Sequence, residues 1–304
     1  MNNFITLCCL SLLLVQCKSA QETKNNHNPN LPFTFEIVDE LDDDISETSG
    51  LEYYNDKLIT HNDSGGKARI YFLDEDGEIE DDTEFKGIDA VDWEDIARDD
   101  KFLYIADTGN NRGDRKDLKI YKIALDDLND KKANFKTLGI SYPDQTIFKM
   151  KKKDNSYDAE ALIALDDYLY AFSKDRKNLK TTVYRFDKET KNQKAATIAI
   201  YDVKGLITGA AFNGKNQIII CGYNSNLVPF IVPINYEDGS FNFGKRYELP
   251  IDNGAQVEAI TFAYTNEEGQ DVYFLTSESA KIKIGGDKVE VDAMLYKMMW
   301  EKQL

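Results

Sequence analysis

TSGLEYY at residues 48–54 is the first of five segments that share one pattern: a polar residue, a short apolar stretch and a polar turn. The other four are WEDIARD (93–99), AEALIAL (159–165), ITGAAFN (207–213) and VEAITFA (257–263). Aligned at intervals of 45, 66, 48 and 50 residues, they bring five polar residues into register: Ser49, Glu94, Glu160, Thr208 and Glu258. We call these five residues the anchors. Repeats of this length are typical of arrays of similar units.

Each repeat unit is predicted to contain four strands. A second apolar strand begins 9, 9, 9, 10 and 14 residues after its anchor, at Leu58, Leu103, Leu169, Ile218 and Val272. The connections before these strands have hairpin chemistry, as at Asn55-Asp56 and Asn213-Gly214, and the last is a longer turn over 266–270. Third strands are expected at 68–74, 118–124, 181–187, 229–235 and 293–299. Fourth strands are expected at 83–88, 136–142, 196–202 and 245–251.

The fifth unit has no fourth strand of its own, but a spare strand at 32–41 precedes the first anchor. That N-terminal strand can complete the last unit and close a ring. The sequence therefore predicts an all-β fold over 32–304: a five-bladed β-propeller with four antiparallel strands per blade. The long interval of 66 residues reflects one insertion, 143–157, which contains Lys149 and Lys151 to Lys153.

The N-terminus has the pattern of an export signal. Phe4 to Val15 is an apolar run too short to span a bilayer, and it ends in Leu14-Val15-Gln16-Cys17. That ending resembles a bacterial lipobox, which predicts a lipoprotein-type signal peptide over 1–17 with lipidation at Cys17. An ordinary cleaved signal with an incidental cysteine is the alternative. The polar stretch 18–31 is then a flexible tether. We expect a monomeric protein of the bacterial cell envelope. Its lipid alone would anchor it to the outer membrane, on the periplasmic or the surface side.

One mouth of the propeller channel is the predicted site. In each blade the innermost strand starts at one face and the second strand returns to it, so the anchors share this mouth with the loops after the second strands. Those loops are polar, and the mouth is a natural ligand site. Candidate ligand-binding residues on them are His61, Asn62, Asp107, Asn110, Arg112, Lys174, Arg176, Tyr223 and Glu278.

Five-fold geometry makes the anchor carboxylates of Glu94, Glu160 and Glu258 converge on the axis. At roughly 5–8 Å such charges repel by about 2–3 kcal/mol per pair. A hard cation with oxygen ligands would relieve this repulsion, and Ca²⁺ accepts six to eight of them. The prediction is a central Ca²⁺ held by all five anchors, Ser49 and Thr208 included. In the alternative, the anchors only cap neighbouring backbone groups and excess charge is lost by protonation.

Other chemistries lack their residues. The formal net charge of −17 argues against nucleic acid as partner. Asp74 to Gly77 hints at a calcium loop, but Phe85 stands where its bidentate Glu belongs, so the segment is predicted to be a hairpin. The chain has two histidines, of which only His61 is in the folded part, and there is no G-x-S-x-G motif. Zinc and serine-hydrolase chemistry are thus disfavoured.

Two families resemble the chain at these residues. VDWEDIA (91–97), YIADTGNN with Arg112 (104–112), YDAEALI (157–163), ITGAAF (207–212) and QVEAITF (256–262) resemble a widespread group of uncharacterised bacterial exported propellers. That resemblance implies fold and export. The anchor order Ser, Glu, Glu, Thr, Glu is similar to that of calcium-activated nucleotidases of the apyrase type, although Thr208 stands where Ser is usual. This second resemblance implies a central Ca²⁺ and places Asp63 beside the attacking water.

Two functions remain open at this point. The first is a propeller that binds a small anionic ligand or an envelope protein at one face over a central Ca²⁺. The second is a calcium-dependent hydrolase of a phosphorylated or other oxyanionic substrate, with Asp63 as the catalytic residue and Lys174, Arg176 and Arg112 holding the anion. Whether the protein is an enzyme at all stays undecided by the sequence.

Overall fold

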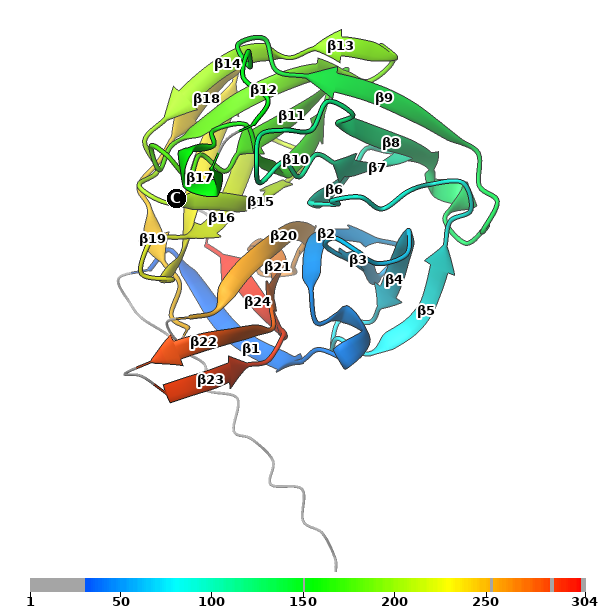
Figure 1. The fold of residues 1–304 in the computed structure, drawn as a ribbon. Helices are drawn as coiled ribbons and strands as arrows, with labels where there is room; N and C mark the ends of the chain where they lie inside the picture. Colours follow the sequence, from blue (N-terminus) through cyan, green and yellow to red (C-terminus); the bar gives the residue numbers. More distant parts are fainter. Residues whose placement is uncertain (1–30, 150, 252–253, 285–286, 302–304) are drawn as a thin grey trace, which may run out of the picture.

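The computed structural model of the chain describes residues 31–149, 151–251, 254–284 and 287–301. Five sheets stand radially around one axis (Figure 1), so the chain is an all-β, five-bladed propeller, as predicted. The predicted signal, Cys17 and the tether up to residue 30 lie outside the described residues. Within the described ranges, no helix is long and apolar enough to cross a membrane.

The first four blades each begin with their innermost strand. Blade 1 contains β2 (Thr48–Tyr54), β3 (Lys57–Asn62), β4 (Arg69–Leu73) and β5 (Ile79–Glu84). Blade 2 contains β6 (Asp95–Arg98), β7 (Phe102–Asp107), β8 (Lys119–Ala124) and β9 (Phe135–Ser141). Blade 3 contains β10 (Ala159–Leu165), β11 (Tyr168–Ser173), β12 (Thr181–Asp187) and β14 (Ala196–Tyr201). Blade 4 contains β15 (Leu206–Phe212), β16 (Gln217–Tyr223), β17 (Pro229–Glu237), β18 (Ser240–Phe243) and β19 (Tyr247–Glu248).

Blade 5 joins the two ends of the chain. Its order is β20 (Gln256–Thr265), β21 (Asp271–Glu278), β24 (Met294–Trp300) and β1 (Phe33–Glu40). β1 pairs antiparallel with β24, from Phe33 opposite Trp300 to Glu40 opposite Met294, and the Phe33 and Trp300 rings stack at 5.6 Å. The predicted closure of the ring by the N-terminal strand is confirmed.

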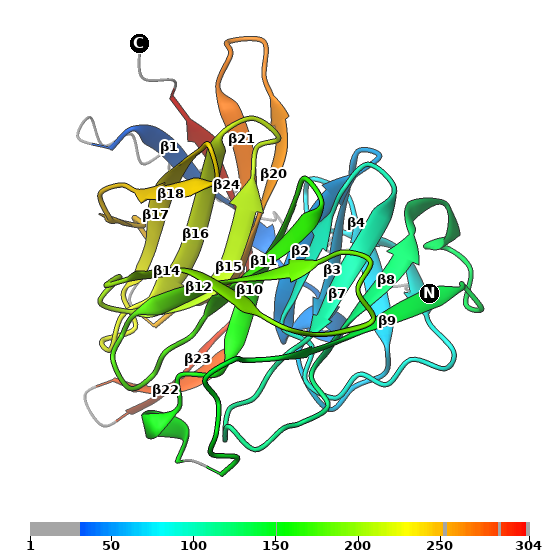
Figure 2. The same ribbon diagram turned by 90° about the horizontal axis from the view of Figure 1, so that it is seen from above.

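Smaller elements decorate the blades. β13 (Asn192–Lys194) leaves blade 3 and pairs in parallel with β9 of blade 2. After β21, β22 (Ala280–Ile284) and β23 (Asp287–Val291) form a hairpin. This hairpin extends beyond the ring on one side (Figure 2). Three short 3₁₀ turns complete the set: η1 (Asp43–Ile45), η2 (Leu125–Asp127) and η3 (Lys152–Asp154).

The core lies between blades rather than at a single centre. Apolar side chains from each sheet face pack against those of the next sheet, forming a cluster at each of the five blade interfaces within the described residues. Between blades 1 and 2, for example, the fully buried Trp93 packs with Ile59 and Ile105. Hydrophobic burial thus joins the blades, and the axis remains for polar groups.

The predicted fourth strands differ from the observed ones in blades 1 and 4. In blade 1 the segment 83–88 was expected, but β5 begins at Ile79, directly after a tight turn in which Gly77 has φ +95°. In blade 4 the segment 245–251 was expected, and Tyr247–Glu248 within it do pair with β17 as β19, but β18 also pairs with β17 directly after a turn formed by Asp238 and Gly239, both at positive φ. Asp-Gly is a strong hairpin signal. In both blades, the residues that directly follow the Asp-Gly turn therefore form a strand that pairs with the third strand.

Candidate metal centre

The five anchors lie at one mouth of the channel and are between 1% and 8% exposed. The loops that follow the second strands return to the same mouth. We call this face the acidic mouth, because it gathers two basic side chains among many acids. Its bases are Lys174 and Arg176, and its acids are Asp63, Asp92, Glu94, Asp158, Glu160, Glu258 and Glu278.

Two of the five anchors are used to connect blades. The Ser49 hydroxyl donates to the backbone carbonyl of Glu94 at 2.6 Å, which ties blade 1 to blade 2. The Thr208 hydroxyl donates to the carbonyl of Val257, also at 2.6 Å, which ties blade 4 to blade 5. The innermost strand of a blade has an unpaired edge facing the axis, and these hydroxyls satisfy carbonyls there. Ser49 and Thr208 therefore have the capping geometry that the sequence left open as an alternative.

A lysine provides the positive charge between two of the anchor glutamates. The Lys174 ammonium contacts the Glu160 carboxylate and lies 3.8 Å from Glu258. Lys174 is 4% exposed, and its ring neighbour Tyr223 lies 5.4 Å from the ammonium. Burial by itself would lower the pKa of Lys174, but the charges of Glu160 and Glu258 outweigh burial and raise it. Part of the repulsion that we expected a central cation to relieve is thus relieved within the chain.

The remaining acids form a compact triad away from Glu258. Glu94, Asp158 and Glu160 each offer a carboxylate oxygen, and these oxygens lie within 4.8 Å of one another. Asp158 is fully buried: its Oδ1 accepts a hydrogen bond from the Asn110 backbone N–H at 2.7 Å, while its Oδ2 has no hydrogen-bond donor. A buried carboxylate oxygen without a donor is costly unless a cation or a proton meets it. We call Glu94, Asp158 and Glu160 the inner triad.

Arg176 faces the inner triad from blade 3. Its Nη2 lies 3.3 Å from Glu160 and 3.5 Å from Asp158, and it donates to the Asn111 side chain at 2.9 Å. Its Nε is buried and has no acceptor. The guanidinium therefore offsets part of the negative charge while one of its donors remains unused.

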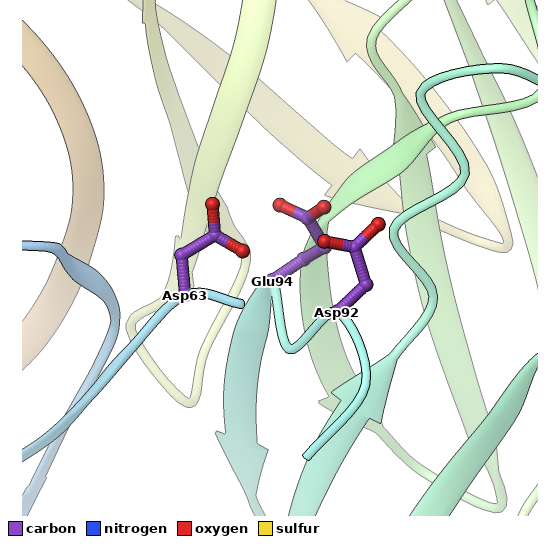
Figure 3. Close-up of side chains that lie close together, drawn as sticks. All are labelled: Asp63, Asp92 and Glu94. Atoms are coloured by element: carbon purple, nitrogen blue, oxygen red, sulfur yellow. The ribbon is translucent and has the colours of Figure 1, made fainter. Parts of the chain in front are cut away.

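A second triad shares Glu94 with the first. Asp63 from the loop after β3, Asp92 before β6, and Glu94 offer carboxylate oxygens within 4.8 Å of one another. Figure 3 shows the three carboxylates turned toward a common space. We call Asp63, Asp92 and Glu94 the outer triad, because Asp63 and Asp92 are partly exposed.

The loop from Asp107 to Asn111 holds both triads in place. The Asp107 carboxylate accepts from the Asp92 backbone N–H at 3.2 Å and from Arg115 at 2.8 Å. At Gly109, an added Cβ would lie 2.1 Å from Glu94 Oε1 and 2.4 Å from Asp92 Oδ2. Only glycine lets this loop pass so close to the carboxylates.

The carboxylates of this face are hard to ionise together. Burial, followed by the charge of Glu160, raises the pKa of both Glu94 and Asp158. Burial also raises the pKa of Glu258 to about 8 and that of Asp63 to about 7. Glu160 is the exception: Lys174 and Arg176 outweigh burial and lower its pKa. At neutral pH these carboxylates therefore favour their protonated form unless positive charge compensates them.

Several predicted ligand-binding residues lie elsewhere or support the loops. His61 is fully buried between blades 1 and 2, edge-on to Trp93, and burial lowers its pKa to about 4. Asn62 donates to the backbone carbonyl of Asp44 at 2.7 Å. Arg112 is exposed, while Glu278 accepts from Gln256 and burial raises its pKa to about 7. Asp107 and Asn110 are almost completely buried and position Asp92 and Asp158, as described above.

Sequence reasoning missed Asp92, Asp158 and Arg115. The two acids share a signal that was available: Asp92-Trp93-Glu94 and Asp158-Ala159-Glu160 repeat the same Asp-x-Glu spacing before consecutive inner strands. Residues two apart in an extended chain point the same way, so each acid joins its anchor. Arg115 lies beyond the turn at Gly113 and donates to Asp107 and to the Gly109 carbonyl.

The opposite mouth of the channel holds a cavity of about 860 Å³. Here charges are paired across blades. Glu52 of blade 1 accepts from the Arg98 backbone N–H at 2.9 Å, Lys188 of blade 3 donates to Asp99 of blade 2 at 2.9 Å, and Lys122 contacts Glu189. Its walls are a mixture of such pairs and of partly exposed aromatic side chains such as Phe212 and Phe262.

No protein-family model matches the chain, and no curated protein matches it. Among solved structures, the chain is similar to the PQQ-bound form of an aldose sugar dehydrogenase from Streptomyces coelicolor. The two share 11% sequence identity, with a TM-score of 0.49, over 88% of this chain and 98% of the other. At this level the comparison says nothing about what the chain binds.

Proposed function

We propose that this protein is an exported envelope propeller that binds a divalent cation, preferably Ca²⁺, at the inner triad. A small anionic ligand, or an acidic group of a partner protein, would bind beside this cation. The observation that carries the proposal is the buried Asp158 Oδ2, which accepts no hydrogen bond and has only Arg176 Nη2 at 3.5 Å, in a group of three buried carboxylates with oxygens within 4.8 Å of one another. All donors are hard oxygens, which suits Ca²⁺ or Mg²⁺ and not zinc or copper. The lipid anchor at Cys17 and the envelope location belong to the same proposal and rest on the N-terminal sequence pattern.

The residues fit a cation because each can be assigned a role. Glu94, Asp158 and Glu160 would hold it, Asn110 fixes the orientation of Asp158, and Arg176 limits the surplus negative charge. When bound, the cation supplies positive charge for an oxyanion at a mouth where acids outnumber bases. Without it the mouth would repel an anion, so cation and anion binding should be positively linked.

The buried donor of Arg176 and the lysines of the insertion support an anionic ligand. Arg176 Nε is buried without an acceptor, and Lys152 lies near enough to Asp92 to lower its pKa against the dominant effect of burial. Both groups would favour phosphate or carboxylate groups arriving from solvent.

The experiment compares melting of chelator-stripped protein with and without Ca²⁺. Wild type should melt higher with Ca²⁺, and Asp158→Asn should lose most of that shift. Glu278→Gln, which removes an acid of the same mouth outside both triads, should keep it. Inorganic phosphate should bind more tightly in the presence of Ca²⁺. Melting that ignores Ca²⁺ in wild type would overturn the proposal.

A second candidate function is a cation-dependent hydrolase of an oxyanionic substrate with Asp63 as general base. The observation in its favour is that burial and the neighbouring acids raise the pKa of Asp63 to about 7, close to the value a base needs. Nucleoside di- and triphosphates and simple phosphate esters are the substrates to try. Ca²⁺-dependent turnover lost in Asp63→Asn would support this function, and no turnover with intact Ca²⁺ binding would leave the binding function.

A further inference from the structure

We infer that the acidic mouth holds two cations rather than one, with Glu94 shared between an inner ion at the inner triad and an outer ion at the outer triad. This inference rests on the proposed function, since it takes the inner ion as given. It adds a second site with a different degree of exposure and a different set of ligands.

The outer triad differs from the inner triad in its lack of partners. Glu160 and Asp158 of the inner triad are approached by Lys174 and Arg176. The carboxylates of Asp63, Asp92 and Glu94 have no hydrogen bond or close ion pair with any described residue, and the positive charges of Arg115 and Lys174 act on Asp92 and Asp63 only from a greater distance. Arg115, the nearest candidate for Asp92, is already engaged by Asp107, Asp117 and the Gly109 carbonyl.

The Glu94 carboxylate is buried at the centre of the outer triad. The Glu94 side chain is 4% exposed and lies between those of Asp63 and Asp92 (Figure 3), and no described residue donates a hydrogen bond to it. Asp63 Oδ1 is likewise buried without a donor. A buried carboxylate left this way is either protonated or met by a cation.

The shared glutamate makes two adjacent ions chemically reasonable. A carboxylate has two oxygens and can give one to each of two ions, which in two-metal sites are about 3.5–4 Å apart. The loop at Gly109 passes so close to Glu94 Oε1 and Asp92 Oδ2 that no side chain can enter there. The Gly109 backbone therefore packs directly against these two carboxylates and fixes their positions on that side.

The two ions should differ in solvent access. All three residues of the inner triad are buried, whereas Asp63 and Asp92 are partly exposed. The outer ion would therefore keep water molecules in its coordination shell and exchange them for the oxygens of an anionic ligand. The outer ion would also be bound by the Asp63 carboxylate, which acts as the general base in the hydrolase function. Asp63 cannot be a metal ligand and the general base at the same time, so the two proposals exclude each other.

The test is the number of Ca²⁺ ions bound per chain, measured by isothermal titration on chelator-stripped full-length protein. Wild type should bind two ions, the weaker by about tenfold or more because it has the more exposed site. Asp92→Asn and Asp63→Asn come from different blades, yet each should remove only the weaker ion. Asp158→Asn should weaken the tighter ion, Glu94→Gln should affect both, and Glu278→Gln should affect neither.

The outcomes separate the two claims. One ion in wild type, unchanged by Asp92→Asn and lost in Asp158→Asn, would overturn the second site and leave the proposed function intact. No binding at all would overturn both. Because Asp63 and Asp92 are partly exposed, their variants are expected to fold, and circular dichroism spectra matching wild type would verify this. Terbium luminescence lifetimes in H₂O and D₂O should show more bound water on the ion that Asp92→Asn removes, and equal hydration of both ions would contradict the exposed outer site.

Discussion

The two mouths of the channel handle buried charge in opposite ways. At the opposite mouth, Glu52, Asp99 and Glu189 each have a basic partner on a neighbouring blade. At the acidic mouth, acids collect against one another: Asp63 Oδ1 and Asp158 Oδ2 accept no hydrogen bond from a described residue, and the nearest basic group to Asp158 Oδ2 is Arg176 Nη2 at 3.5 Å. Paired charges hold blades together, while unpaired like charges are tolerated only where a ligand compensates them. The contrast is the reason for proposing the cation site at the acidic mouth and not at the opposite one.

The largest expected effect concerns the lysine of each mouth. In Ca²⁺-free protein, Lys174→Met leaves Glu160 and Glu258 without their shared ammonium and should cost about 3–5 kcal/mol of unfolding free energy. The matched variant Lys188→Met loses the bonds to the partly exposed Asp99 and to the Asp166 carbonyl and should cost about 1–2 kcal/mol. Denaturant unfolding of both variants measures the difference. Equal costs would mean that the two mouths do not differ in this respect.

The effect of Glu94→Gln on the stability of the fold should change sign when Ca²⁺ is added. In chelator, the substitution removes a buried charge that burial and Glu160 disfavour, and stability should rise by about 1–2 kcal/mol. With excess Ca²⁺ the variant loses a ligand that wild type uses and should be the less stable of the two, as Tm values would show. A stabilising effect of similar size under both conditions would argue against a cation at Glu94.

The pH dependence should differ between the mouths as well. Burial raises the folded pKa of Glu258 from 4.5 to about 8, so the folded state holds this proton more tightly than the unfolded state. Ca²⁺-free protein should therefore be most stable below pH 4.5 with respect to this group and lose stability as pH rises toward 8. Glu258→Gln should remove part of that slope in denaturation curves collected across this range. An unchanged slope would show that Glu258 is ionised in the folded state at neutral pH.

Asp99 at the opposite mouth should contribute a pH dependence of stability opposite to that of Glu258. Burial would raise its pKa, but the hydrogen bonds from Lys188, the Lys101 backbone and Tyr104 outweigh burial and lower it from 3.8 to about 2. Its contribution to stability is present above pH 3.8 and is lost as pH falls toward 2. Asp99→Asn should flatten the stability curve only in that acid window. A change near neutral pH instead would contradict the assigned pairing.

The smallest expected effect tests the two hydroxyl anchors. Ser49→Ala and Thr208→Val each leave a carbonyl of the neighbouring inner strand without its donor and should cost about 1–2 kcal/mol. Because these hydroxyls connect blades, Ca²⁺ affinity should stay within about twofold of wild type, far from the tenfold effect expected for a lost ligand. A large loss of Ca²⁺ affinity in either variant would return Ser49 or Thr208 to the set of ligands.

The ring could be predicted because its signals are local and repeated. Each anchor begins an apolar strand, each hairpin has turn residues, and the spare N-terminal strand has one place to go, opposite β24. Outer strands were less predictable, since their pairing depends on turns such as Asp238-Gly239 that compete with more apolar sequence downstream.

The site was predicted only in part, because the sequence gives a residue's height along the axis but not the direction of its side chain. Glu94 and Glu160 were placed correctly at one mouth, yet both come within 4.8 Å of Asp158, and Glu258 belongs to neither triad. The position of Lys174 depends on how the loop after β11 folds back over the axis, with its backbone N–H on the Asp158 carbonyl at 2.6 Å. That contact joins residues of one blade through a loop whose path no periodicity encodes.

Anomalous diffraction from crystals soaked in Mn²⁺ or a lanthanide locates the cation directly. A peak within ligand distance of Asp158, Glu94 and Glu160, with Lys174 still between Glu160 and Glu258, is the predicted result. A peak on the axis between Glu160 and Glu258 in place of the Lys174 ammonium, or no peak at the acidic mouth, would contradict the assignment of the inner triad as the metal centre.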